Sequence, residues 1–127
     1  MYSIGDLVIR IKNGYRARRE QIDSPYSAYR EEIVKKLVSL RYIESYEVSG
    51  DIVKSMKIIL KYENGNPAIT DVKLFSTPGR RWYVGVHELK PVLGGMGYAL
   101  ISTPQGILTN IEARKKKMGG ELLFNIW

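Results

Sequence analysis

The chain is organised around the stretch Ile101-Ser102-Thr103-Pro104-Gln105-Gly106-Ile107-Leu108-Thr109. Apolar residues at 98–101 and 107–108 flank a tight polar segment that contains Pro and Gly. This pattern is typical of two short strands joined by a turn. We therefore expect the hydroxyls of Ser102 and Thr103 to lie at the rim of a sheet.

A helix is predicted directly after this hairpin. Thr109 stands three residues before Glu112, the spacing of a capping box, in which the hydroxyl accepts a backbone N–H and the carboxylate reaches back. The helix carries cations at 114–117 and is expected to end at Gly119-Gly120, because glycine enters the left-handed region easily. Hydroxyls, glycine backbone and cations of this kind bind the phosphates and sugars of nucleic acids.

The composition favours a polyanionic partner. The 127 residues carry a formal net charge of +7, and each phosphate that a protein neutralises releases counterions and strengthens binding. Nucleic acid is the first candidate. A membrane surface is the second, although no apolar run approaches the roughly 20 residues of a spanning helix and the N-terminus does not resemble a signal peptide. With no cysteine and a single histidine, we expect no disulfide, metal centre or cofactor, and an intracellular location.

The N-terminal half is predicted to begin with helix, strand and helix. Residues 4–11 carry an apolar stripe at helical spacing, and Ser3 stands at capping-box distance from Asp6. Residues 21–25 are expected to be extended, and a second helix begins at Ser27. We interpret this second helix as scaffold.

A hairpin is predicted next, with strands at 42–48 and 56–62 around a turn at 49–51. Lysines 54, 57 and 61 would line one side of it. Outward-facing lysines on an edge strand bind a polyanion or only prevent aggregation, and both interpretations stay open. The same holds for the run 10–19, where five cations and no acid indicate either a solvated face or phosphate contacts.

Turn-forming residues at 63–67 separate the two halves. We place an N-terminal α/β lobe at 1–64 and a C-terminal β-rich lobe at 65–127, which makes the fold class α+β with two small lobes. The elements expected in the second lobe, besides the hairpin and its helix, are an extended segment at 68–76, a type II turn at 77–80, a strand at 82–84, one helical turn near 87–93 and a closing strand at 121–127. In the closing strand, Leu122, Phe124 and Ile126 are expected to alternate with Leu123 and Asn125 on the opposite face.

Arg80 and Arg81 leave the predicted turn beside Trp82 and Tyr83. A guanidinium next to aromatic rings can stack on unpaired bases, as in proteins that recognise single-stranded RNA. The alternative is that the rings pack in the core and the arginines are solvated. Neither a nucleophile with its base nor a metal cluster is visible, and neighbouring residues such as His87 and Glu88 do not face each other. We predict that the chain is not an enzyme.

Several motifs occur in one register along the whole chain. They are Ile4-Gly5-Asp6-Leu7, Arg10-Ile11-Lys12-Asn13-Gly14, Ser76-Thr77-Pro78-Gly79-Arg80-Arg81-Trp82-Tyr83, Gly94-Gly95-Met96-Gly97-Tyr98-Ala99-Leu100-Ile101-Ser102-Thr103, Gly106-Ile107-Leu108-Thr109, Ala113-Arg114 and Gly119-Gly120-Glu121-Leu122. In these motifs the chain resembles the bacterial family of small ribosomal subunit protein eight, most specifically in its C-terminal third.

The resemblance implies a structural protein of the ribosome in the cytoplasm, with two α+β lobes. Members of that family bind the central domain of 16S rRNA early in assembly and help to organise the platform of the 30S subunit, beside neighbouring ribosomal proteins. In many bacteria the same surface also represses translation of a messenger that mimics the RNA site, so repression by this chain of its own mRNA is a further candidate role.

The candidate RNA-binding residues come from this resemblance and from the charge pattern. They are Arg10, Lys12, Asn13, Lys54, Arg80, Arg81, Tyr83, Ser102, Thr103, Gly106, Thr109, Arg114, Gly119, Gly120 and Glu121.

Pro104 departs from the family pattern, which usually has a third hydroxyl at this position. Proline removes both an O–H and a backbone N–H, so at most two of three hydroxyl contacts can form. Losing a neutral hydrogen bond costs about 1 kcal/mol, roughly a fivefold change in affinity. The alternative function is a protein-binding adaptor without RNA specificity, which would use exposed tyrosines such as Tyr26 and Tyr29.

Overall fold

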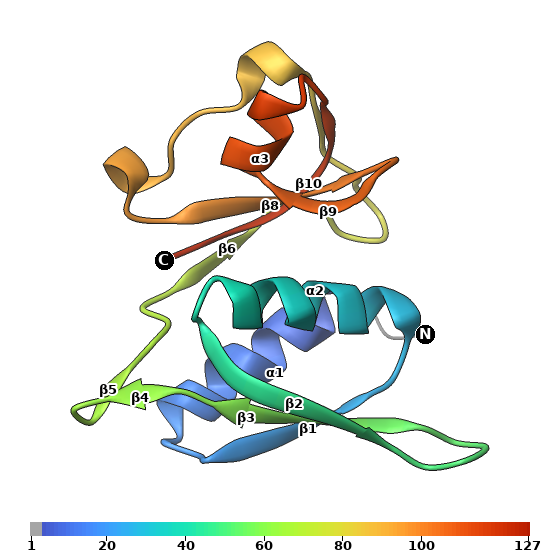
Figure 1. The fold of residues 1–127 in the computed structure, drawn as a ribbon, viewed down its shortest axis with the longest axis vertical. Helices are drawn as coiled ribbons and strands as arrows, with labels where there is room; N and C mark the ends of the chain where they lie inside the picture. Colours follow the sequence, from blue (N-terminus) through green and yellow to red (C-terminus); the bar gives the residue numbers. More distant parts are fainter. Residues whose placement is uncertain (1–3) are drawn as a thin grey trace. The chain divides into compact units, whose positions relative to one another are not determined.

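The computed structural model of the protein describes residues 4–127 (Figure 1). The predicted capping role of Ser3 lies outside the described residues. The chain divides into two compact units, Met1–Ile69 and Thr70–Trp127, whereas the turn-forming residues placed the division after residue 64. No helix among the described residues is long and apolar enough to cross a bilayer.

The first unit has the predicted order of helix, strand, helix and hairpin. Its elements are α1 (Ile4–Arg16), β1 (Gln21–Pro25), α2 (Ala28–Ser39), β2 (Ile43–Ser49), β3 (Ser55–Leu60), β4 (Tyr62–Glu63) and β5 (Asn66–Pro67). The three longer strands form an antiparallel sheet in the order β1-β3-β2. Figure 1 shows α1 and α2 on one face of this sheet.

The core of the first unit follows from the apolar periodicity of its elements. Strand side chains alternate between the two faces of a sheet, and helix residues three and four apart share one face. Ser27 begins α2 as predicted, because its hydroxyl accepts the backbone N–H of Arg30 at 3.1 Å. The buried side chains on the helix-covered side are Leu7, Val8, Ile11, Ile33, Val34, Leu37, Met56, Ile58 and Leu60.

The second unit is mostly antiparallel sheet with one short α-helix, as predicted. Its elements are β6 (Val72–Leu74), β7 (Tyr83–Val84), η1 (Val86–Glu88), η2 (Leu93–Gly95), β8 (Tyr98–Thr103), β9 (Gly106–Thr109), α3 (Asn110–Lys115) and β10 (Gly120–Ile126). The strands are ordered β6-β10-β8-β9, and β7 also pairs with β10. The strands β8 and β9 form the hairpin expected from the sequence around Pro104.

The helix α3 begins where the capping box predicts. Thr109 Oγ1 accepts the backbone N–H of Glu112 at 3.1 Å, and Glu112 Oε1 accepts that of Thr109 at 3.0 Å. The helix covers one face of the sheet, where a small apolar core is buried. Its buried members are Leu89, Ile101, Leu108 and Ala113.

Two predictions about chain reversals are wrong. The helix ends at Lys115, and the left-handed residue beyond it is Lys117, with φ +56°, whereas Gly119 and Gly120 do not have a positive φ. The turn at 77–80 is closed by a bond from Arg80 N to Thr77 O at 3.1 Å, but it is not type II, because Gly79 lacks the positive φ that this type requires.

The alternation predicted for the last strand breaks at a β-bulge. The register of β10 against β8 shifts between Leu122 and Phe124, and an extra residue reverses the direction of the side chains that follow. Leu123 is therefore buried together with Phe124 and Ile126, although it was expected on the opposite face. The predicted helical turn near 87–93 is likewise divided into the two short 3-10 turns η1 and η2.

Candidate nucleic-acid interface

The β8–β9 turn is held together by the Thr103 hydroxyl. Thr103 and Gly106 are paired across the hairpin, and Gly106 has φ +106°, which a glycine adopts without strain. Thr103 Oγ1 donates to Gly106 O at 2.9 Å and accepts from Gln105 N at 3.1 Å. Its proton is thus already used, and what it can offer a ligand is a remaining lone pair.

The hydroxyl of Ser102 is differently placed. Its side chain is half-buried, and none of the hydrogen bonds found among residues 4–127 involves its Oγ. A serine hydroxyl is one donor and two acceptors. Ser102 is therefore the hydroxyl at this rim that is able to both donate to and accept from a ligand.

Ser102 belongs to a row of side chains across three strands. It is paired with Glu121 of β10, which is itself paired with Tyr83 of β7. Residues directly opposite each other in a sheet point to the same face. The fold thereby brings Tyr83, which is 69% exposed, onto the same face as Ser102 from a distant part of the sequence.

The acidic member of this row is neutralised. Arg81 Nη1 donates to Glu121 Oε2 at 3.2 Å, and the Glu121 side chain is 15% exposed. An ion pair of this kind contributes little stability at a surface. Its relevance is electrostatic, because a polyanion approaching the row meets a paired carboxylate and a half-exposed guanidinium.

Gly119 and Gly120 are required by close packing at the start of β10. A Cβ on Gly120 would lie 2.2 Å from Ser102 O, and one on Gly119 would lie 2.4 Å from Val84 O. Real Cβ atoms do not approach backbone oxygens so closely. These two glycines thus set the distance between β10 and its neighbours, and with it the position of Ser102.

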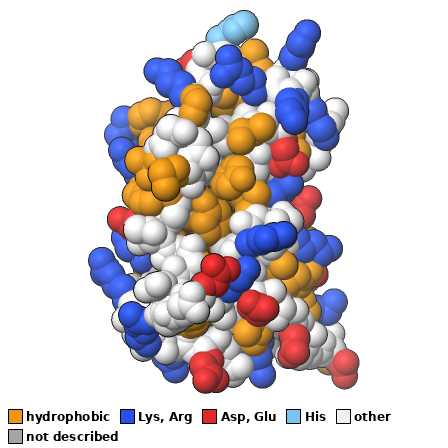
Figure 2. Space-filling view, turned by 60° about the vertical axis from the view of Figure 1, so that its left-hand side comes forward, with side chains coloured by type: hydrophobic (Ala, Val, Ile, Leu, Met, Phe, Trp, Pro, Cys, Tyr) orange, Lys and Arg blue, Asp and Glu red, His pale blue; other side chains and the backbone are white. Residues whose placement is uncertain are grey.

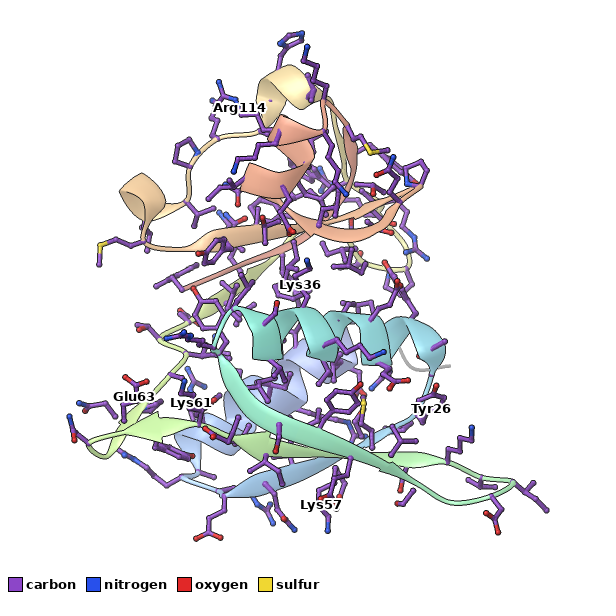
Figure 3. The ribbon with its side chains drawn as sticks, viewed as in Figure 1. Tyr26, Lys36, Lys57, Lys61, Glu63 and Arg114 are labelled. Carbon is purple, nitrogen blue, oxygen red and sulfur yellow. The ribbon has the colours of Figure 1, made fainter. Side chains whose placement is uncertain are left out.

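The basic block after Thr109 does not lie beside the hydroxyls. Ile101 packs in the core beneath α3, and successive side chains of a strand point to opposite faces, so Ser102 points away from α3. Arg114 extends from α3 in Figure 3, and lysines 115–117 that follow it are exposed. Thr109 is 2% exposed and caps α3, so it supports the hairpin instead of offering a hydroxyl to a ligand.

The surface of the second unit is nonetheless basic. Figure 2 shows blue Lys and Arg side chains predominating over red Asp and Glu in the upper part of the view, which residues 70–127 form. Of the cations in this unit, Arg80 and Arg81 precede β7, and Arg114 and Lys115 lie in the last turn of α3. Polyanion attraction is thus available on both sides of the rim.

In the first unit, α1 and β1 line an open groove of about 510 Å³. Its lining includes Arg10, Asn13 and Arg19. Arg10 and Asn13 lie on one side of α1, because they are three residues apart, and Ala17 follows the end of the helix in the same lining. Lys12 lies outside this lining and is half-buried, so the structure brings two of the three α1 candidates together.

Arg10 is held in place by a network that the sequence reading missed. Arg10 Nε donates to Asp6 Oδ2 at 2.9 Å, and Asp6 also accepts from Arg30 Nη2 at 3.1 Å. Arg30 is 2% exposed and donates to Ser24 Oγ at 2.6 Å. The sequence did contain one signal for the burial of Arg30. Arg30 precedes the buried Ile33 by three residues, a spacing that places both side chains on the same side of α2.

Asp6 is the shared acceptor of the two arginines. Burial by itself raises the pKa of Asp6, but the hydrogen bonds and charges of Arg10 and Arg30 outweigh it, and the net pKa is lowered from 3.8. The carboxylate therefore stays ionised at neutral pH and keeps Arg10 at the mouth of the groove.

Lys54 and Lys57 lie on different sides of the sheet. Lys54 Nζ is 5.4 Å from the centroid of the Tyr26 ring, beside α2. Lys57 projects from the face that the helices leave open (Figure 3), and Lys61 is 3.5 Å from Glu63. The three lysines thus do not form the single row expected from the sequence.

Tyr26, one of the two tyrosines named for an adaptor function, is engaged within the unit. The Tyr26 and Tyr46 hydroxyls donate to the two carboxylate oxygens of Glu31, at 2.9 Å and 2.8 Å. These bonds lower the pKa of Glu31, whereas burial and the bond to Glu31 raise the pKa of Tyr46 to about 12. A partner protein would find the polar end of Tyr26 already occupied.

Comparison with known proteins identifies the family of the chain. A family model described as ribosomal protein S8 matches residues 3–127. The chain is 46% identical over 125 residues to small ribosomal subunit protein uS8 of Dictyoglomus turgidum, covering 98% of the chain and 95% of that protein. It is 44% identical over 126 residues to uS8 of Caldicellulosiruptor bescii, covering 98% and 96%. The chain therefore belongs to the ribosomal protein S8 family and is a structural, non-enzymatic constituent of the small ribosomal subunit in the cytoplasm.

Proposed function

We propose that the chain binds the central domain of 16S rRNA early in assembly and helps to organise the platform of the 30S subunit. The observation that carries this proposal is the rim of the second unit, where Tyr83 and Ser102 share one face next to the Thr103–Gly106 turn. Hydroxyls and backbone groups at such a rim suit the base edges and 2′-hydroxyls of an irregular RNA helix.

The proposed interface combines charged contacts, which supply affinity, with neutral contacts, which supply specificity. Cations of both units supply salt-dependent attraction to phosphates, and the neutral groups of the rim supply specificity. In the first unit the proposed contacts are Arg10, Lys12, Asn13 and Lys54. In the second they are Arg80, Arg81, Tyr83, Ser102, Thr103, Gly106 and Arg114, with Gly119, Gly120 and Glu121 adjoining and Thr109 as the supporting cap.

The test is binding to separate domains of 16S rRNA. The purified protein is titrated into the central, 5′ and 3′ domain transcripts at several salt concentrations. We expect the tightest binding to the central domain and a slope of affinity against salt that reflects several phosphate contacts. Equal affinity for all three transcripts would contradict the proposal, and partner capture that ribonuclease does not change would favour an adaptor.

Replacing Ser102 by alanine should weaken binding to the central domain by about 1 kcal/mol, or roughly fivefold, because one neutral hydrogen bond is lost. The salt slope should not change, since no charge is removed. Thr103→Ala is not an equivalent probe, because it also removes two bonds that hold the turn. Thr103→Ser keeps that hydroxyl and serves as the control, and an equal loss for Ser102→Ala on scrambled RNA would exclude a role in specificity.

Replacing Arg10 by alanine should weaken binding to cognate and scrambled RNA alike and lower the salt slope by about 1, as expected for one phosphate contact. Arg41→Ala removes an exposed arginine outside the proposed contacts and is the matched control. A salt slope that is the same for Arg10→Ala and the parent protein would remove Arg10 from the contact set.

We also propose that the same rim binds the chain's own ribosomal-protein messenger. A rim that reads the shape of an irregular helix does not distinguish rRNA from a messenger that imitates it. The messenger segment should then compete with the central domain, and Ser102→Ala should weaken both complexes by the same factor. Simultaneous binding of the two RNAs would contradict a shared surface.

A further inference from the structure

Trp82 and Arg80 form an exposed pair beside the hydroxyl rim. The guanidinium carbon of Arg80 lies 5.8 Å from the centroid of the Trp82 ring, and Trp82 is 41% exposed. A single exposed apolar side chain needs no special explanation. Here, however, a guanidinium lies within cation–π distance of the ring, and both aromatic rings and guanidinium planes can stack on unpaired bases.

Backbone hydrogen bonds and a ring contact hold Trp82 in place. The backbone N–H of Trp82 donates to Ser76 Oγ at 2.8 Å, and its carbonyl accepts from Leu122 N at 2.8 Å. The ring meets Phe75 at an angle of 63°, with the ring centroids 5.7 Å apart. A ring held in this way loses little conformational freedom when a ligand stacks on it.

The groups around the ring favour an anionic ligand. Lys73 Nζ lies 5.3 Å from the centroid of the Phe75 ring, and Arg81 continues the chain between Arg80 and Trp82. The carboxylate of Glu121 is paired with Arg81 at 3.2 Å, so its charge is compensated. A ligand that has both a flat ring and phosphates would meet stacking and charge at one place.

We propose that Trp82 and Arg80 stack an unpaired nucleobase of the bound RNA between indole and guanidinium. This inference rests on the proposed RNA-binding function and adds a base-stacking site to the hydroxyl rim. Two stacking contacts of about 3.5 Å each need roughly 7 Å between indole and guanidinium, so Arg80 must move outward slightly. Arg80 lies in an exposed turn, and the stack accepts any base because every base has a π face.

Fluorescence of Trp82 tests this directly. The chain has two tryptophans, so Trp127→Phe leaves Trp82 as the single indole emitter. This Trp127→Phe protein is the parent for the tests of Trp82. Its titration with the central-domain transcript should quench the Trp82 emission with the same midpoint as binding. Trp82→Leu should lower affinity about tenfold, as expected for the loss of one stacked base, without changing the salt slope, whereas Trp82→Tyr should retain most of the affinity.

The outcomes separate this inference from the function on which it rests. Full binding without quenching, together with parental affinity for Trp82→Leu, would overturn the stacking site and leave RNA binding by the rim intact. Absence of binding by the parent to any transcript would overturn both. Quenching is measured in the folded parent, so a loss of stability in Trp82→Leu does not affect that result.

Discussion

Replacing Gly120 by alanine is expected to lower the free energy of unfolding by about 3 kcal/mol, the upper range for inserting a methyl into a packed site. The added Cβ would lie 2.2 Å from Ser102 O and 3.1 Å from Ile101 Cγ2. Backbone cannot rotate away as a flexible side chain can, so β8 and β10 must separate. Urea denaturation followed by circular dichroism measures the change.

Gly79→Ala is the matched control for this substitution. A Cβ on Gly79 meets no atom within 4 Å, and Gly79 has no positive φ, so the free energy of unfolding should change by less than about 0.5 kcal/mol. Because Gly120→Ala also displaces Ser102, it should weaken RNA binding more than Ser102→Ala does. Parental stability for Gly120→Ala would show that β8 and β10 are not so closely packed.

Replacing Asp6 by alanine should destabilise the protein by about 2–3 kcal/mol. Arg30 is 2% exposed and would lose its carboxylate partner, and breaking a buried ion pair costs roughly 3–5 kcal/mol. The expected loss is smaller here because the Asp6 side chain is 35% exposed and Ser24 still accepts from Arg30. Asp23→Ala removes an exposed carboxylate and is the control.

The effect of Asp6 should depend on pH. Its pKa in the folded protein is lowered from 3.8, so its contribution is fully present above about pH 4 and is lost as the pH falls through the lower, folded-state pKa. The difference in stability between the parent and Asp6→Ala should therefore shrink in acid. A difference that stays constant down to about pH 2 would show that the carboxylate is not the source of the stabilisation.

Local signals in the sequence predicted most of the fold. The capping box of Thr109 and Glu112, the N-cap at Ser27 and the alternation around Met56 and Ile58 each depend on residues a few positions apart. The α+β class and the β8–β9 hairpin followed from such signals and are confirmed.

Several of the errors concern features set by residues that are distant in sequence. Gly119 and Gly120 were predicted to end a helix. They are instead required because the backbone oxygens of Val84 and Ser102, far away in sequence, leave no room for a Cβ. The bulge between Leu122 and Phe124 depends on pairing with β8. Helical spacing places Arg30 on the buried side of α2. Its partners Asp6 and Ser24 come from two other elements, and no local pattern identifies them.

The hydroxyls at 102–103 and the cations at 114–117 were predicted to act together as one segment, and the structure separates them. Strand alternation separates Ser102 from the cations of α3, whereas the sheet pairs it with Glu121 and thereby aligns it with Tyr83. Sequence proximity therefore identified the hydroxyls but not their neighbours.

Footprinting of the purified protein on full-length 16S rRNA tests recognition by this rim most directly. We expect protection from hydroxyl radicals to be confined to an irregular helix of the central domain, and to require higher protein concentrations for Ser102→Ala than for the Thr103→Ser control. Protection outside the central domain, or an identical footprint for both variants at every concentration, would contradict it.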